Sequence, residues 1–149
     1  MSAPPELCGI FSDALAEVLA VSTGAQYHPV SVRPGETLCA VAGMMTLAGQ
    51  KHGLLLIHAS EAAMREVYTL MTGADDVTDA DITDTACEIV NMTAGSAKLR
   101  LGGSDYAFSL TTPLVIKGDG MSLFAKQRVS VFDAALECAG SLIHIKLVY

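Results

Sequence analysis

The sequence predicts an α+β fold in which an antiparallel β-sheet carries helices packed on one face. The patterns follow one another as one helix, two strands, two helices and then several strands, without the strand and helix alternation of a parallel doubly wound sheet. Of the 149 residues, 51% are hydrophobic, and no long polar tract suggests a linker. Residues 1–149 are therefore predicted to form a single domain with one core.

Apolar stripes predict the first two helices. Ser60 is a suitable N-cap for the second helix and Gly73 a suitable end, whereas Gly24 ends the first. Residues 26–34 are predicted to be a loop. The stripe of the first helix consists of Leu7, Ile10, Phe11, Ala14, Leu15, Val18 and Leu19, and that of the second consists of Met64, Val67, Tyr68 and Met71.

A hairpin and several later strands are predicted by small apolar runs and by two-residue alternation. Residues 36–48 and 53–59 are separated by a short polar turn at 49–51. Near the C-terminus, apolar residues at 143, 145 and 147 alternate with His144 and Lys146. His58 and His144 are interpreted as ordinary strand residues.

Charge and residue spacing exclude several function classes. The formal charge is −7 with nine Lys and Arg, so binding to nucleic acid is not expected. No apolar run reaches the ~20 residues of a membrane helix, and no signal-peptide pattern begins the chain, so a cytoplasmic protein is expected. The four cysteines and four histidines lack metal-ligand spacing; the cysteines are predicted to be buried free thiols, and no metal site is expected.

A third helix of about 20 residues is predicted to end near Leu101, after an acidic start and a basic last turn. At about 100° per residue, one face holds Ile82, Ala86, Ile89, Thr93 and Ala97 and is predicted to face the core. Asp84, Glu88, Asn91 and Gly95 lie on the opposite side, within roughly 60° of Glu88. This second face is predicted to point away from the core.

The exposed face is either a solvated surface or a contact surface. A solvated face has no need for Asn91 or for Gly95, which costs about 1 kcal/mol relative to alanine in a helix. Asp84 and Glu88 are also like charges four residues apart, which is mildly unfavourable. A docking partner accounts for these residues, because glycine permits close approach, a carboxylate meets a cation and an amide holds a water. Met92 is predicted to supply an adaptable apolar rim.

The segment DTACEIVNMTAGSAK resembles the signature of the chemotaxis phosphatases of the CheC, CheX and FliY group, and a single copy in a short chain is most similar to CheX. The family pattern continues to a proline, matched here by Pro113, with 21 residues between it and Asn91, one fewer than usual. The residues that carry the resemblance are Asp84, Glu88, Asn91, Met92, Gly95 and Lys98.

The resemblance implies dephosphorylation of the aspartyl phosphate of a CheY-like response regulator. Asn91 would position the attacking water and Glu88 would pair with a lysine of the regulator; the remaining matched residues would contact the partner. The resemblance also implies that Mg²⁺ belongs to the partner's receiver domain, that this chain binds no cofactor and that it forms a homodimer. Two alternatives remain at this point: a receiver-binding or flagellar module without turnover, and an unrelated enzyme that uses Cys87 or a histidine.

Overall fold

The computed structural model describes residues 6–35, 37–125 and 128–149, so Glu36, the predicted first residue of the hairpin, lies outside the described residues. Helices and strands follow in the predicted order. The elements are α1 (Glu6–Thr23), β1 (His28–Val30), β2 (Val41–Gly49), β3 (Gly53–Ala59), α2 (Glu61–Thr72), α3 (Asp79–Leu101), β4 (Phe108–Ser109), β5 (Leu114–Lys117), β6 (Val131–Cys138) and β7 (Ser141–Val148).

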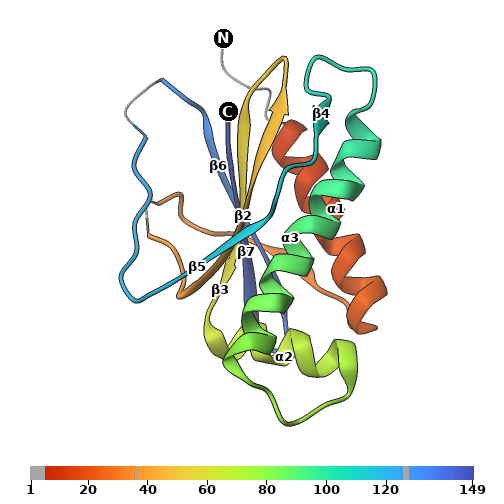
Figure 1. The fold of residues 1–149 in the computed structure, drawn as a ribbon, viewed down its shortest axis with the longest axis vertical. Helices are drawn as coiled ribbons and strands as arrows, with labels where there is room; N and C mark the ends of the chain where they lie inside the picture. Colours follow the sequence, from red (N-terminus) through yellow and green to blue (C-terminus); the bar gives the residue numbers. More distant parts are fainter. Residues whose placement is uncertain (1–5, 36, 126–127) are drawn as a thin grey trace.

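The strands form one antiparallel sheet, and the helices cover one of its faces (Figure 1). Within the described residues the strand order is β1-β6-β7-β3-β2-β4, and β5 also pairs with β2. Helices α1 and α3 lie side by side on the covered face, and α2 lies near the start of α3. The predicted α+β class, an antiparallel sheet with helices on one face, is confirmed.

Two predicted boundaries differ from the structure. The predicted loop 26–34 contains the short edge strand β1, in which Val30 pairs with Ala135 of β6. Three residues show no alternation, and Pro29 is tolerated only because an edge strand leaves one backbone side free. The predicted turn at 49–51 begins one residue later, since Gly49 remains in β2 and pairs with Phe108.

The core lies between the sheet and the helices. The α1 stripe is buried as predicted, except that Ile10 is only partly buried, and the core face of α3 is buried throughout. The four cysteines are free thiols as predicted, but each is partly exposed rather than buried. Cys8 and Cys138 lie at the ends of elements, where packing is incomplete.

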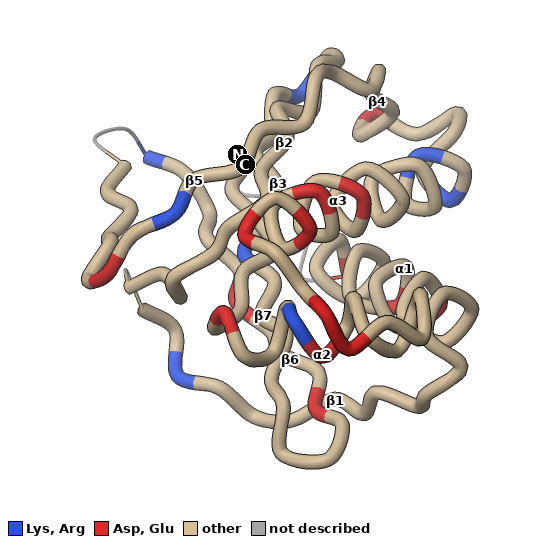
Figure 2. Tube along the Cα trace, turned by 60° about the horizontal axis from the view of Figure 1, so that its bottom comes forward, with Lys and Arg blue, Asp and Glu red and all other residues tan. Residues whose placement is uncertain are grey.

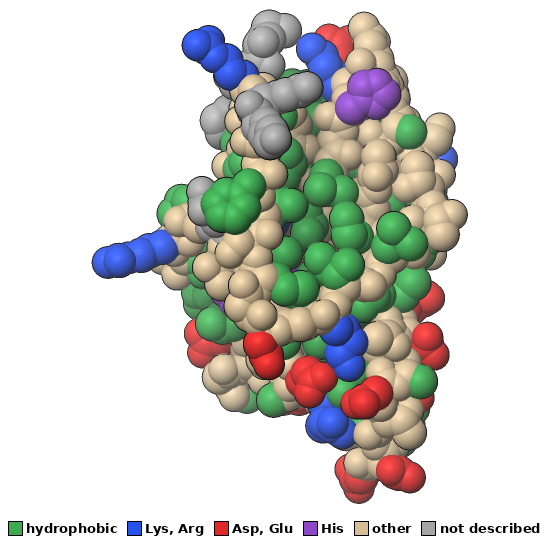
Figure 3. Space-filling model, turned by 60° about the vertical axis from the view of Figure 1, so that its left-hand side comes forward, with side chains coloured by type: hydrophobic (Ala, Val, Ile, Leu, Met, Phe, Trp, Pro, Cys, Tyr) green, Lys and Arg blue, Asp and Glu red, His purple; other side chains and the backbone are tan. Residues whose placement is uncertain are grey.

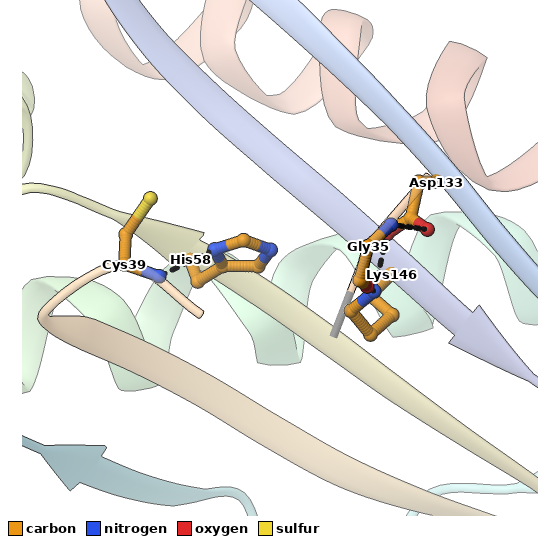
Figure 4. Close-up of polar contacts among 5 residues, drawn as sticks. All are labelled: Gly35, Cys39, His58, Asp133 and Lys146. Carbon is orange, nitrogen blue, oxygen red and sulfur yellow. Dashed lines mark hydrogen bonds and ion pairs between the residues drawn. The ribbon is translucent and has the colours of Figure 1, made fainter. Parts of the chain in front are cut away.

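The opposite face of the sheet carries a buried polar cluster (Figure 4). The Lys146 ammonium is buried and donates to Asp133 Oδ1 at 2.5 Å and to the Gly35 carbonyl at 2.6 Å. The Cys39 backbone N–H donates to Nδ1 of His58 at 3.0 Å. These bonds hold the segment before β2 over the sheet. That segment covers polar strand residues that would be expected in solvent from the two-residue alternation alone.

Burial of His58 predicts a loss of stability in acid. Burial lowers its pKa from 6.5 to about 4, with smaller lowering by His144 and Lys146 and an opposing effect of Asp133. Between pH 4 and pH 6.5 the unfolded state therefore binds more protons at His58 than the folded state does. The contribution of neutral His58 to the free energy of unfolding is complete above pH 6.5 and is lost as pH falls toward 4. The loss is about 3 kcal/mol at most. Denaturant unfolding at pH 7 and 4.5 measures it; the same loss in His58→Gln would contradict this assignment.

Candidate functional site

Helix α3 begins at a capping box and ends in basic residues. The Asp81 N–H donates to Thr78 Oγ1 at 3.2 Å, and the Thr78 N–H donates to Asp81 Oδ2 at 2.9 Å. These bonds hold the pKa of Asp81 below its ordinary value. Acidic residues gather toward the start of the helix and basic ones at its end (Figure 2), which complements the helix dipole. The helix that carries the candidate site is thus fixed at its start.

Close packing on β2 fixes the position of α3 along its length. A Cβ added at Gly43 of β2 would lie 2.5 Å from the Ala86 carbonyl oxygen, so the backbones approach as closely as glycine permits. The predicted core residues of α3, Ile82, Ala86, Ile89, Thr93 and Ala97, are all buried here. With its back against the sheet, α3 presents its other side outward.

The predicted site residues lie on this outward side, with one difference. Glu88 and Asp84 are exposed, and Asn91 is partly exposed. Lys98 is exposed one turn before the end of the helix. Met92 is also partly exposed but differs in packing partly against the core, and its sulfur lies 3.9 Å from Ser22 Oγ of α1, at the seam between the two helices.

Gly95 has no packing reason within the described chain to lack a side chain. A Cβ added there meets nothing within 4 Å, and its backbone is helical. Alanine would be the more stable residue at such a position. The space above Gly95 is therefore open to a partner.

The structure brings Pro113 next to the predicted site. Its carbonyl oxygen lies 4.0 Å from the Sγ of Cys87, the residue before Glu88. Strand β5 begins directly after Pro113 and pairs with β2, which itself packs against α3. Pro113 thus lies beside α3 at the level of Glu88, although the interval from Asn91 is one residue short.

The histidines of the sheet cannot join this site. Gly43 faces α3, so its neighbour Ala42 faces the other side of the sheet, together with its cross-strand partners His58 and His144. The two imidazole rings stack there with centroids 5.0 Å apart. The sheet therefore separates them from Cys87, and this arrangement disfavours an enzyme built on Cys87 and these histidines.

The remaining features of the described residues concern metals and membranes. Across 6–35, 37–125 and 128–149, no three His, Cys, Asp or Glu side chains come together as a metal site would require. None of the helices described in the structure combines the length and hydrophobicity needed to cross a membrane.

One exposed residue of the α3 face was not among the predicted site residues. Leu99 is 85% exposed and lies about 20° from Glu88 on the helical wheel. The helical wheel contains this signal, since it places an apolar side chain on the predicted outward face close to Glu88. The predicted face covered only the polar residues and glycine.

Comparison with known proteins identifies close structural relatives. Residues 41–133 match the family model for the chemotaxis phosphatase CheX. A CheX structure from Vibrio vulnificus is 25% identical, with a TM-score of 0.84 and coverage of 99% of this chain and 98% of that one. A CheC-like protein from Shewanella sp. PV-4 is 23% identical, with a TM-score of 0.86 and 98% coverage of both chains.

A structure that contains a bound partner is also similar. The CheX-CheY-BeF3-Mg²⁺ complex from Borrelia burgdorferi gives 19% identity and a TM-score of 0.77, with 95% of this chain and 96% of that chain covered. At this identity the likeness concerns the fold. A search of curated protein sequences gave no significant match.

Two glycine substitutions test how α3 is held. Gly43→Ala forces the added Cβ against the Ala86 carbonyl and should lower the free energy of unfolding by about 1–3 kcal/mol. Gly95→Ala, the matched control in open space, should raise it by up to about 1 kcal/mol. Denaturant unfolding of both variants measures these changes. Equal stability of the two variants would contradict close packing at Gly43.

Proposed function

This chain belongs to the CheX family of chemotaxis phosphatases, and on that premise we propose that it hydrolyses the aspartyl phosphate of a CheY-like receiver domain in the cytoplasm. The observation that carries the proposal is the placement of Glu88 and Asn91. Both lie on the outward face of a helix whose opposite face is buried, so two side chains of suitable chemistry project from a rigid support. A rigid support is what positioning a reactant requires.

Asn91 is proposed to position the attacking water. A neutral amide is too weak a base to remove a proton, but its oxygen accepts a hydrogen bond and its nitrogen donates two. It can therefore hold water in line with the phosphorus, and placement of a nucleophile accounts for a large share of catalysis in phosphoryl transfer. An acyl phosphate has a good leaving group, so little further chemistry is needed from this chain.

Glu88 is proposed to dock the receiver by pairing with a lysine beside its phosphorylation site. Its exposed carboxylate lies one turn from Asn91, about 4.5 Å along the helix axis. Asp84 lies one turn earlier and adds negative charge that favours a cationic partner. Mg²⁺ held by the receiver would neutralise the phosphoryl oxygens, which leaves this chain the tasks of docking and positioning.

The remaining predicted contacts surround this pair. Gly95 leaves open space for a partner's backbone, Pro113 borders the site next to Cys87, and Lys98 extends the polar surface. Met92 would support the site by holding α3 against α1, because its sulfur contacts Ser22. A binding module without turnover would use the same surface, and it differs from the phosphatase only in leaving the phosphate lifetime unchanged.

Substitution of the two polar residues should separate catalysis from docking. Asn91→Ala is expected to lower the rate of receiver dephosphorylation at saturation by about a hundredfold or more while binding persists. Glu88→Gln should instead weaken binding. The measurements are phosphate release in Mg²⁺ and titration against a receiver carrying beryllium fluoride as a phosphoryl mimic. Full activity of Asn91→Ala would overturn the proposed role of the amide.

We also propose that the chain forms the homodimer that the family resemblance implies. Large apolar side chains are exposed on or beside the sheet face without helices, and Figure 3 shows them around a hollow on that side. They include Leu114, Ile116, Phe124, Val129 and Val131.

Light scattering tests the dimer. A dimer should give about twice the chain mass of 15.5 kDa at tens of micromolar protein. Val131→Asp, placed at the start of β6 in this apolar region, should lower the measured mass if that region is buried between subunits. A wild-type mass equal to one chain would contradict the proposal.

A further inference from the structure

Two side chains on α1 and α3 are exposed to an unusual degree. Leu99 of α3 is 85% exposed and Val21 of α1 is 82% exposed, more than any other large hydrophobic residue in the described part of the chain. Single exposed apolar residues are common, but these two lie on adjacent helices. Their positions relative to Glu88 and Asn91 therefore matter.

Leu99 continues the outward stripe of α3. It follows Glu88 by eleven residues, which places it about 16 Å along the helix axis and about 20° around it. Gly95 lies between them on the same stripe, and a side chain added there would meet nothing. An open path thus leads along one side of the helix from the polar pair to the exposed leucine.

Val21 lies next to this path across the seam between the helices. Arg100 of α3 bonds to Glu17 of α1, whereas Met92 lies against Ser22, so the two helices run antiparallel. Val21 follows Glu17 by one turn on the same side of α1 and therefore lies between these two contacts. The Arg100 and Glu17 charges neutralise each other beside it.

The apolar residues of β5 do not extend the same surface. Val115 pairs with Gly43 and faces α3, so its neighbours Leu114 and Ile116 face the opposite side of the sheet. Among the described residues, the most exposed large apolar side chains on the same side of the sheet as Glu88 and Asn91 are therefore Val21, one residue before the Ser22 contact with Met92, and Leu99, farther along α3.

Interface size supports a role for this extension. A stable protein interface buries about 800 Å² on each partner, far more than two polar side chains provide. Charged contacts at the edge of an interface contribute little affinity, whereas a few residues that become fully buried contribute most of it. A surface that begins at Glu88 needs an apolar section, and α3 provides one within about 16 Å.

We propose that Leu99, with Val21 as a second apolar contact nearer the polar pair, anchors the receiver domain, separate from the polar pair that acts on its phosphate. The proposal rests on the proposed function. It assigns to the partner an apolar patch that reaches Leu99, about 16 Å along the axis of α3 from Glu88. Affinity then comes from the anchor and turnover from Asn91, so the two properties are separable by substitution.

Glutamine substitutions test the anchor. Glutamine keeps the length and helix propensity of leucine, so Leu99→Gln should fold normally. It should raise the Kd for a beryllium fluoride-loaded receiver, and the KM for the phosphorylated one, by about tenfold, because burial of a leucine contributes roughly that factor or more. The rate at saturation should not change. Val21→Gln should have a smaller effect in the same direction.

Leu142→Gln is the matched control. Leu142 is also an exposed leucine, at 37%, but its neighbour Ile143 is buried in the core that faces the helices, so Leu142 faces the other side of the sheet. The Kd of the Leu142→Gln variant for the beryllium fluoride-loaded receiver should equal that of the wild type. A Kd of the Leu99→Gln variant within twofold of the wild-type Kd would overturn the anchor. A lower mass of this variant by light scattering, with an unchanged Kd for the receiver, would also overturn it, since this face would then contact a second copy of the chain.

The same measurements separate this proposal from the proposed function. A wild-type chain that binds the receiver and loses affinity on Leu99→Gln, yet leaves the phosphate lifetime unchanged, supports the anchor and contradicts the phosphatase. Normal hydrolysis with an unaffected Leu99→Gln contradicts only the anchor. Absence of any receiver binding overturns both.

Discussion

The close contact between Gly43 and Ala86 is the constraint on which the site depends. It lets α3 lie directly on β2, so the whole core side of the helix is buried and its opposite side is held outward. Glu88 and Asn91 then project from a support that cannot roll without opening the core. The capping box and the Met92 contact with α1 fix the start and the middle of the same helix. Precision at the site is thus a consequence of packing behind it.

The sheet separates two kinds of polar residue. On the outward face of α3, the Asp84 and Glu88 carboxylates are exposed and available to a partner. On the other side, Lys146 and His58 are buried and Asp133 is partly buried; they bond to one another or to backbone groups and hold the segment before β2 in place. A charge buried without its partner is costly, so the second group serves stability. Similar residue types therefore have different tasks according to the face on which they lie.

The helical part of the fold was predictable, because a 3.6-residue period assigns each side chain of α3 to a face without knowledge of its neighbours. The same period placed Glu88 and Asn91 outward. Burial of Lys146 was not predictable, since it depends on a segment far away in sequence that covers the sheet. Likewise, the place of Met92 depends on α1, and β1 is too short to show a period. The sequence pattern therefore predicts local geometry well, and it predicts poorly which residues are buried by segments distant in sequence.

Hydrolysis of an aspartyl phosphate by this chain is tested by the lifetime of the phosphoryl group on a receiver domain. A panel of CheY-like receiver domains would be phosphorylated, and the decay of the phosphate followed in Mg²⁺ with increasing amounts of the wild-type chain. The lifetime of at least one receiver should shorten in proportion to the added protein until binding saturates. An unchanged lifetime for every receiver that binds the chain would contradict hydrolysis by this chain.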